Sequence, residues 1–498
     1  MKNIIKSLGK YAVLSGFLCL GASCTDQLEL TPVSTITASG FWVNEDNANG
    51  ALNGLYVRFR DEVSNNFFFW GEVRSETLSY GLQASEGRER YFENTLDPTF
   101  AGPTWLRLYT IIHDTNLIIK YVPEIKFNRE ADKNRMLAQA YTMRAFIYFT
   151  MARTWGGVPI VTNPTEGYDA ETTFRERATV NEVFDLIKSD LDNALQLYPD
   201  NTLSSSKAFW SKPACNMLKG EVYLWTGKKL SGGQADFTTA LQALTEASTA
   251  PGLGLLPNFD QIFRYHNKGN AEILFAVRFL DLESGSNYNS SLYIRDDEIP
   301  SSIDPELEKR IGQGGGLNRM APSQILRSAY SQDDQRKDAT FAEINIPNQD
   351  GTPRYYGSLV MKYRGFVDAS GRRFIDDIII YRYADLLLLV AEAKNALGQD
   401  PSLEINKVRK RAYGEAFENH QFVNGSTEEN NEAILKERLL ELAFEGKRWW
   451  DLVRFDMAFE KIPSLQNRSN QRHLELWPIS LSTISLNSKI IQNPGYGN

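Results

Sequence analysis

Hydrophobic residues recur every three or four positions over most of this chain, which is the spacing of one buried face of an α-helix. The pattern predicts helices over residues 41–56, 105–122, 130–154, 180–197, 207–226, 236–247, 383–397, 403–412, 429–444 and 447–459. Gly156 and Gly157 end the third of these, and Val158-Pro159 prevents its resumption. The helices follow one another in pairs that are joined by short polar or glycine-containing turns.

This pairing predicts a mainly α fold of tetratricopeptide-like helix pairs. Gly220 and Tyr223 match one fragment of the signature of that repeat. No strict period of roughly 34 residues is visible, however. An irregular helical domain without repeat ancestry therefore stays open as the alternative.

Helical periodicity fades between about residues 251 and 380, where Gly, Asn and Ser become dense in 284–291 and 312–316. Short β-like runs occur there at 273–279 and 359–363. A second stretch that reads as a loop covers 62–103, between the first two expected helices. Loops on a rigid scaffold commonly carry binding surfaces, so we expect the ligand on these two stretches.

The N-terminus has the layout of a secretory signal. Lys2 and Lys6 precede an apolar run at 11–20 that is too short to span a bilayer, and three small residues then lead to Cys24. We expect cleavage before Cys24 and acylation of its sulfur, although Gly21 stands where a lipobox usually has leucine. An ordinary secretory signal is the alternative.

These observations divide the chain into a signal peptide, a lipidated tether and a helical body. The expected boundaries are 1–23 for the signal, 24–40 for the tether and 41–498 for the body. Within the body we expect an N-terminal helical part, a loop-rich ligand-side insertion with short β-strands and a C-terminal helical part, at 41–250, 251–380 and 381–498.

Composition narrows the class of protein. The chain has 498 residues, of which 42% are hydrophobic, so it can bury one large core or two to three smaller ones. Its formal net charge of −8 argues against nucleic acid as a partner. Only three cysteines occur, and removal of the signal and acylation would leave Cys215 alone, so no disulfide framework is expected.

Signatures of enzymes are missing. The chain contains no HExxH, CxxC, GxSxG or P-loop motif, and its four histidines lack metal-ligand spacing. We therefore expect no catalytic residues, no metal and no cofactor. The two carboxylates of a glycosidase need not be close in sequence, so a surface glycoside hydrolase stays open.

A cluster of charges between Glu437 and Arg454 alternates with apolar residues at helical spacing. Packed carboxylates and arginines perturb one another's pKa values, which permits an acid/base site. We interpret the cluster instead as charges paired between packed helices that fix the angle of one helix pair.

An ordered set of short motifs along the whole chain resembles the SusD/RagB family of outer-membrane lipoproteins. The motifs lie at 24–26, 41–56, 105–116, 144–159, 190–194, 382–395, 406–412, 437–448, 451–454, 477–479 and 492–496. Ser480 departs from the pattern, because a proline usually follows Pro-Ile in the family.

The resemblance implies an α-helical fold of tetratricopeptide-like pairs with a loop-rich ligand face. It also implies a lipid-anchored protein on the outer surface of the outer membrane, acting as the lid of a SusC-like TonB-dependent transporter. Such a protein catches an oligomeric nutrient, usually a glycan, and delivers it to the barrel. Capture of peptides, as in RagB-like members, is the alternative within the family, and a structural adaptor is the alternative outside it.

The family motifs mark scaffold, so the ligand residues are expected from the physics of sugar binding. That chemistry needs flat aromatic rings on exposed loops, beside amide, carboxylate or arginine groups that bond hydroxyls. The expected ligand residues are Trp70, Arg74, Tyr80 and Tyr91 in the first loop-like stretch, and Tyr288, Tyr293 and Tyr355 in the insertion.

Overall fold

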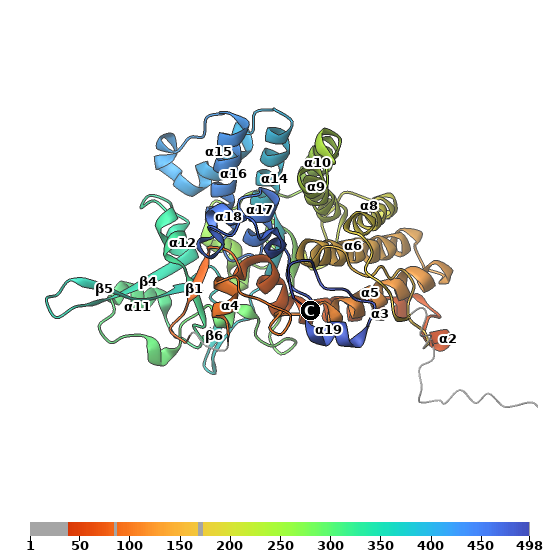
Figure 1. The fold of residues 1–498 in the computed structure, drawn as a ribbon, viewed down its shortest axis with the longest axis horizontal. Coiled ribbons are helices and arrows are strands. Elements are labelled where there is room, and N and C mark those ends of the chain that lie inside the picture. Colours follow the sequence, from red (N-terminus) through yellow and green to blue (C-terminus); the bar gives the residue numbers. More distant parts are fainter. Residues whose placement is uncertain (1–37, 84–86, 168–172, 498) are drawn as a thin grey trace, which may run out of the picture.

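The computed structural model describes residues 38–83, 87–167 and 173–497. A row of antiparallel helices builds its N-terminal half, each packed against the next. The row consists of α3 (Glu45–Glu62), α5 (Leu106–Tyr121), α6 (Glu130–Trp155), α8 (Val180–Leu197), α9 (Lys212–Lys229) and α10 (Gly233–Ser248). Figure 1 shows these helices stepping across one side of the molecule. The mainly α fold of paired helices that the sequence predicts is confirmed.

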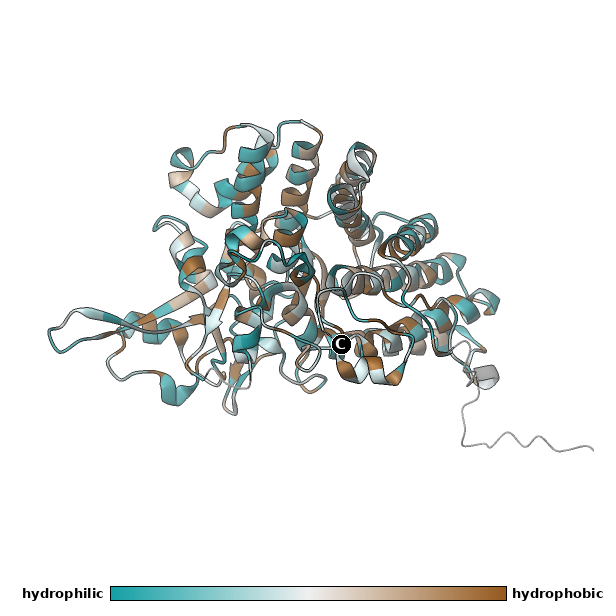
Figure 2. Cartoon of the chain, viewed as in Figure 1, coloured by the Kyte–Doolittle hydropathy of each residue, from teal (hydrophilic) through white to brown (hydrophobic). Residues whose placement is uncertain are grey.

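The C-terminal helices continue this row, because α14 packs against both α9 and α10. They are α14 (Tyr383–Ala396), α15 (Ser402–Tyr413), α16 (Thr427–Leu442), α17 (Arg448–Arg454), α18 (Ala458–Lys461) and α19 (Leu481–Leu486). Figure 2 shows hydrophobic residues concentrated where helices meet and hydrophilic residues on their outer sides. This distribution follows from the three-to-four spacing of apolar positions.

Helix α8 shows how the local sequence fixes such an element. The Thr179 hydroxyl accepts from the backbone N–H of Glu182, whose carboxylate accepts in return from the backbone N–H of Thr179. This capping box satisfies N–H groups that the first turn leaves without partners. The buried face then carries Val183, Ile187 and Leu191 at three-to-four spacing.

The stretch after α3 differs from the sequence expectation of a loop at 62–103. The chain stays helical, with wider π-type turns in η1 (Val63–Phe67) and η2 (Phe69–Val73). The short helix α4 (Glu89–Phe92) follows later in the same stretch. The π-type turns bury Phe67, Phe68 and Trp70 in the main core. This is a correction with a physical reason: four consecutive aromatic residues, at 67–70, pack against the core on several sides of one continuing helix.

The insertion consists of short antiparallel strand pairs and small helices. Strand β2 (Ile273–Val277) pairs with β8 (Ile378–Arg382), which brings the start and the end of the insertion together. The other pairs are β1 (Leu78–Tyr80) with β3 (Met320–Pro322), β4 (Phe341–Pro347) with β5 (Pro353–Val360), and β6 (Phe366–Asp368) with β7 (Gly371–Arg373). The small helices are α11 (Pro305–Ile311), α12 (Gln324–Ala329) and α13 (Lys337–Thr340).

One of the two predicted strands is confirmed and the other only in part. The β-like run at 273–279 is confirmed as β2, whereas the run at 359–363 overlaps only the end of β5. In Figure 1 the β4–β5 hairpin projects from the end of the molecule opposite α3 and α5. Its exposed position makes it the most prominent part of the insertion.

Buried ion pairs join the insertion to the C-terminal helices. Arg382 binds the carboxylates of Glu272, Glu441 and Glu445, and all four side chains are fully buried. Arg336 of the insertion binds Glu441 in the same way, at 3.0 Å. The charged cluster of the sequence is thus paired between packed segments, as its structural interpretation predicts.

Within the described residues, no helix combines the length and the apolar character needed to cross a membrane. The expected signal peptide lies outside the described residues, as do Cys24 and most of the expected tether.

Candidate ligand-binding site

The β4–β5 hairpin carries polar and aromatic side chains on one face and core residues on the other. Ala342 and Ile344 are buried in a separate hydrophobic cluster with Leu359. Asn345, between them and the hairpin tip, is exposed, and it lies opposite Tyr355 in the register. Side chains directly opposite each other in an antiparallel pair share one face.

Tyr355 is the aromatic centre of this outer face, with 45% of its surface exposed. Its hydroxyl lies 3.0 Å from the Ser358 hydroxyl, and the Arg327 guanidinium lies 4.3 Å from the ring centroid. Arg327, on α12, also pairs with the carboxylate of Glu343 on β4. We call Arg327, Glu343, Asn345 and Tyr355 the hairpin face.

A cavity of about 660 Å³ adjoins the hairpin face, because Glu343 and Asn345 line it together with residues of α11. The side chain of Asp304 caps α11 by accepting from the backbone N–H of Leu307 at 2.9 Å. The other lining residues include both acids and bases: Asp304, Glu306, Lys309 and Arg310. Opposite charges side by side make this cavity polar without a strong net charge.

Tyr80, the second expected aromatic residue that is exposed, lies on β1 with 52% of its surface open. Its hydroxyl donates to Glu93 at 2.9 Å, and this hydrogen bond raises the pKa of Tyr80. Strand β3 connects β1 to the hairpin, since the Ser358 hydroxyl donates to the Pro322 carbonyl at 3.1 Å. Tyr80 and Tyr355 therefore lie on adjoining segments, and both remain predicted ligand residues.

Three expected ligand residues of the first stretch are buried, which corrects their placement on an exposed loop. Trp70 is 1% exposed, and its Nε1 donates to the Pro103 carbonyl at 3.0 Å. Arg74 is fully buried over the Trp449 ring at 4.1 Å, and burial lowers its pKa to about 10. Burial also raises the pKa of Tyr91 to about 12. These side chains hold the core together and offer no surface to a ligand.

Two expected residues of the insertion are corrected in the same way. Tyr288 stacks on Phe68 with ring centroids 4.1 Å apart, and its hydroxyl donates to the Phe444 carbonyl at 3.1 Å. Tyr293 is fully buried, and its hydroxyl donates to the Ile311 carbonyl at 2.6 Å. Tyr288 packs into the main core, whereas Tyr293 is buried in the separate hydrophobic cluster within the insertion.

Arg327, Glu343 and Asn345 are site residues that the sequence interpretation missed. The run from Phe341 to Ile346 contains a signal for two of them, because buried Ala342 and Ile344 alternate with more exposed Glu343 and Asn345. Alternation of this kind is typical of a half-buried strand. Arg327 has no comparable signal, since its side chain reaches Tyr355 and Glu343 from a separate element, α12.

Comparisons with known proteins agree with this architecture. Residues 47–224 match a family model described as starch-binding associating with outer membrane, and residues 370–496 match the SusD family model. A solved SusD superfamily protein from Bacteroides vulgatus is 30% identical, with a TM-score of 0.82, and the match covers 92% of this chain and all of that one. The chain belongs to the SusD family.

Two further relatives support the assignment to the SusD family. The B. fragilis protein NanU is 34% identical and has a TM-score of 0.81, over 94% of this chain and 100% of that chain. The SusD-like protein P38 of Formosa agariphila is 28% identical over 95% of this chain and 96% of its own length. The resemblance read from the sequence motifs is thereby confirmed, and with it an association with glycans and the outer membrane at the level of the family.

Proposed function

We propose that this SusD-family protein binds an oligo- or polysaccharide at the cell surface and delivers it to a SusC-like TonB-dependent transporter. The hairpin face is the observation that carries the proposal. Tyr355 offers a half-exposed ring for the apolar face of a sugar, and Asn345 and Glu343 beside it offer groups that bond hydroxyls. Membership of the SusD family supports the same ligand class.

The protein would act by binding alone. We infer no catalytic residues. The side chains of the hairpin face would bind a sugar chain without cleaving it. Acylation of Cys24 would hold the body on the outer membrane close to its transporter, where a tether raises the effective concentration of the lid. The intact mass of the mature protein from membranes tests the acylation.

A peptide ligand is the second candidate, and one observation favours it. Lys309 and Arg310 lie on α11 in the cavity beside the hairpin face, where they would attract the carboxylates of a peptide. Arg310 forms an ion pair with Asp338 at 2.8 Å, and the Asp338 side chain is 75% exposed. A carboxylate of a ligand can therefore compete with Asp338 for Arg310.

A binding screen of the protein starting at Thr25 separates these functions. Affinity gels that contain neutral polysaccharides, and calorimetry with mixed peptides, report the ligand class. We expect retardation by at least one polysaccharide, no binding of peptides and no release of reducing ends. Binding of peptides without binding of any glycan would contradict the proposal, and release of sugars would identify a hydrolase.

A further inference from the structure

A second cavity, of about 350 Å³, lies between α3 and α5, away from the hairpin face. In Figure 1 these helices and the β4–β5 hairpin occupy opposite ends of the long axis. The cavity therefore belongs to a different surface from the proposed glycan site. Its volume lies within the range of about 300–1,000 Å³ that is usual for small-molecule sites.

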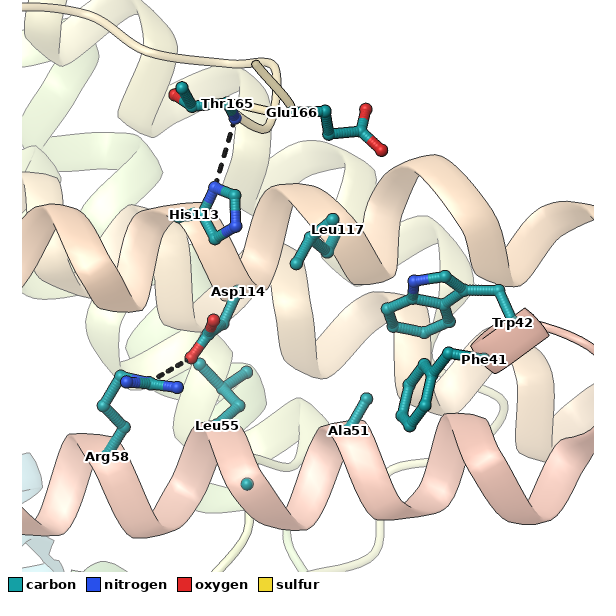
Figure 3. Close-up of a pocket in the computed structure, with 11 residues that line it drawn as sticks. Phe41, Trp42, Ala51, Leu55, Arg58, His113, Asp114, Leu117, Thr165 and Glu166 are labelled. Carbon is teal, nitrogen blue, oxygen red and sulfur yellow. Dashed lines mark hydrogen bonds and ion pairs between the residues drawn. The ribbon is translucent and has the colours of Figure 1, made fainter. Parts of the chain in front are cut away.

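Aromatic rings form one end of this cavity, as Figure 3 shows for Phe41 and Trp42. The Trp42 ring is held in place by stacking on Tyr121, with centroids 5.4 Å apart and planes 12° apart. Phe41 meets Trp42 edge to face at 5.1 Å. The rings are partly exposed, so they offer apolar surface in a fixed orientation.

Polar groups form the other end. Arg58 Nε donates to Asp114 Oδ2 at 2.5 Å, and Asp114 Oδ1 accepts from no group among the described residues. Figure 3 shows the His113 ring between Thr165 and Asp114. Its Nδ1 accepts from the backbone N–H of Thr165 at 3.2 Å. The neutral ring then carries its proton on Nε2, a donor with no partner within the part of the chain that the structure describes.

This combination of groups indicates the class of ligand. A sugar ring has an apolar C–H face that packs on aromatic rings, and neighbouring hydroxyls that need a donor and an acceptor close together. Arg58 and Asp114 neutralise each other, and Glu166 is paired with Lys120, so the cavity has no unpaired charge to attract an ionic ligand. A neutral sugar fits this lining better than a charged one.

We propose that the cavity between α3 and α5 is a second carbohydrate site, which binds one or two neutral sugar residues. This second site rests on the proposed function for its class of ligand, but none of its residues belongs to the hairpin face. Two sites at opposite ends of one molecule would hold a long glycan at two points, and that raises affinity for the polymer above affinity for a short fragment.

Gly54 permits a sharp test, because it lines the cavity and no atom lies within 4 Å of the position that a Cβ would occupy. Gly54→Leu fills the cavity and replaces a poor helix former in α3 with a good one, so the fold is kept. Gly50→Leu is the matched control, since Gly50 lies one turn earlier on α3, has the same free space and does not line the cavity.

The test uses saturation-transfer NMR with maltose, cellobiose, laminaribiose and mannobiose. In a protein that also carries Asn345→Ala and Tyr355→Ala, we expect binding of at least one disaccharide to persist. Gly54→Leu should weaken that residual binding at least tenfold, and Gly50→Leu should leave it unchanged. Trp42→Ala should weaken it as well, by removal of the stacking ring.

Residual binding that is equal in Gly54→Leu and Gly50→Leu would overturn the proposal, as would the absence of residual binding in the Asn345→Ala Tyr355→Ala protein. Either result leaves the proposed function intact if the wild-type protein binds. A wild-type protein that binds no saccharide of the screen would overturn the proposed function together with the second site.

Discussion

At the scale of single residues, the protein buries many charged side chains, and several of them are paired with side chains of opposite charge. Glu392 on α14 shows the principle: one carboxylate oxygen accepts from Arg454 Nε at 2.8 Å and the other from Arg454 Nη2 at 2.9 Å. Lys228 lies 2.9 Å from the same carboxylate. Burial alone would raise the pKa of Glu392, but Arg454 and Lys228 outweigh it and hold the pKa at about 2.

Because of this pairing, we expect Glu392→Gln to destabilise the fold by an amount that depends on pH. In the unfolded chain a glutamate has a pKa of about 4.3, so the ionised carboxylate stabilises the fold fully above that value and loses its effect as the pH falls towards 2. We expect the substitution to lower the free energy of unfolding by about 3–5 kcal/mol at pH 7, because it leaves buried cations without their partner. The loss should shrink by about 2 kcal/mol at pH 3.

Urea unfolding at both pH values measures the two losses. Glu460→Gln is the control, because Glu460 pairs with Lys461 at the surface and its side chain is 62% exposed. Its removal should cost less than about 1 kcal/mol. A cost of Glu392→Gln that is the same at pH 3 and pH 7 would show that the carboxylate has an ordinary pKa.

At the scale of elements, the π-type segment η2 and the turn before α17 depend on each other. A Cβ on Gly71 would lie 1.9 Å from the carbonyl oxygen of Gly446, so only glycine permits this approach of the two backbones. The neighbouring Glu72 accepts from the backbone N–H groups of Phe444 and Lys447 at 3.0 and 3.1 Å. Phe444 and Gly446 both have positive φ angles, of 68° and 73°.

Gly71→Ala should therefore destabilise the protein by about 3 kcal/mol or more, since neither backbone can retreat without loss of the hydrogen bonds to Glu72. Gly50→Ala on α3 is the matched control, because its new methyl group meets open space. It should stabilise the helix by about 0.5–1 kcal/mol. Guanidinium unfolding of both variants provides the comparison, and equal stabilities would refute the close approach.

The elements also show what the sequence can predict. Helices with a regular apolar stripe, such as α8, follow from periodicity and capping residues alone. The segment of η1 and η2 does not, because π-type turns break the 3.6-residue period and four aromatic residues follow one another at 67–70. Read as a loop, this segment made Trp70 a ligand residue, although the structure buries it.

The same limit applies to the candidate site. Whether an aromatic residue in an irregular segment faces the core or the solvent depends on how that segment folds back, and local sequence does not encode this. Tyr293 and Tyr355 both belong to the insertion, where helical periodicity fades, yet the first is fully buried and the second is 45% exposed. The exposure of Asn345 could be predicted from the alternation of apolar and polar positions in β4. The position of Arg327 beside Tyr355 could not be predicted from local sequence.

At the scale of the whole molecule, the hairpin face and the second cavity are carried by one continuous body. Arg382 and Arg336 tie the insertion to the C-terminal helices through fully buried ion pairs. Because such a network tolerates little movement, we expect the hairpin to present a fixed surface at one end of the molecule. A rigid surface loses little conformational entropy on binding, which favours capture of a glycan in one step.

Calorimetry of Tyr355→Ala with a polysaccharide that the wild-type protein binds tests most directly whether the hairpin face is the glycan site. Removal of the ring should weaken binding at least tenfold, because stacking on an aromatic face supplies much of the contact. Tyr223→Ala is the matched control, since Tyr223 on α9 also carries a cation over its ring, with Lys188 Nζ at 4.3 Å. Tyr223→Ala should bind the polysaccharide with wild-type affinity. Equal affinity of Tyr355→Ala and the wild-type protein, with both folded, would contradict the assignment of the glycan site to the hairpin face.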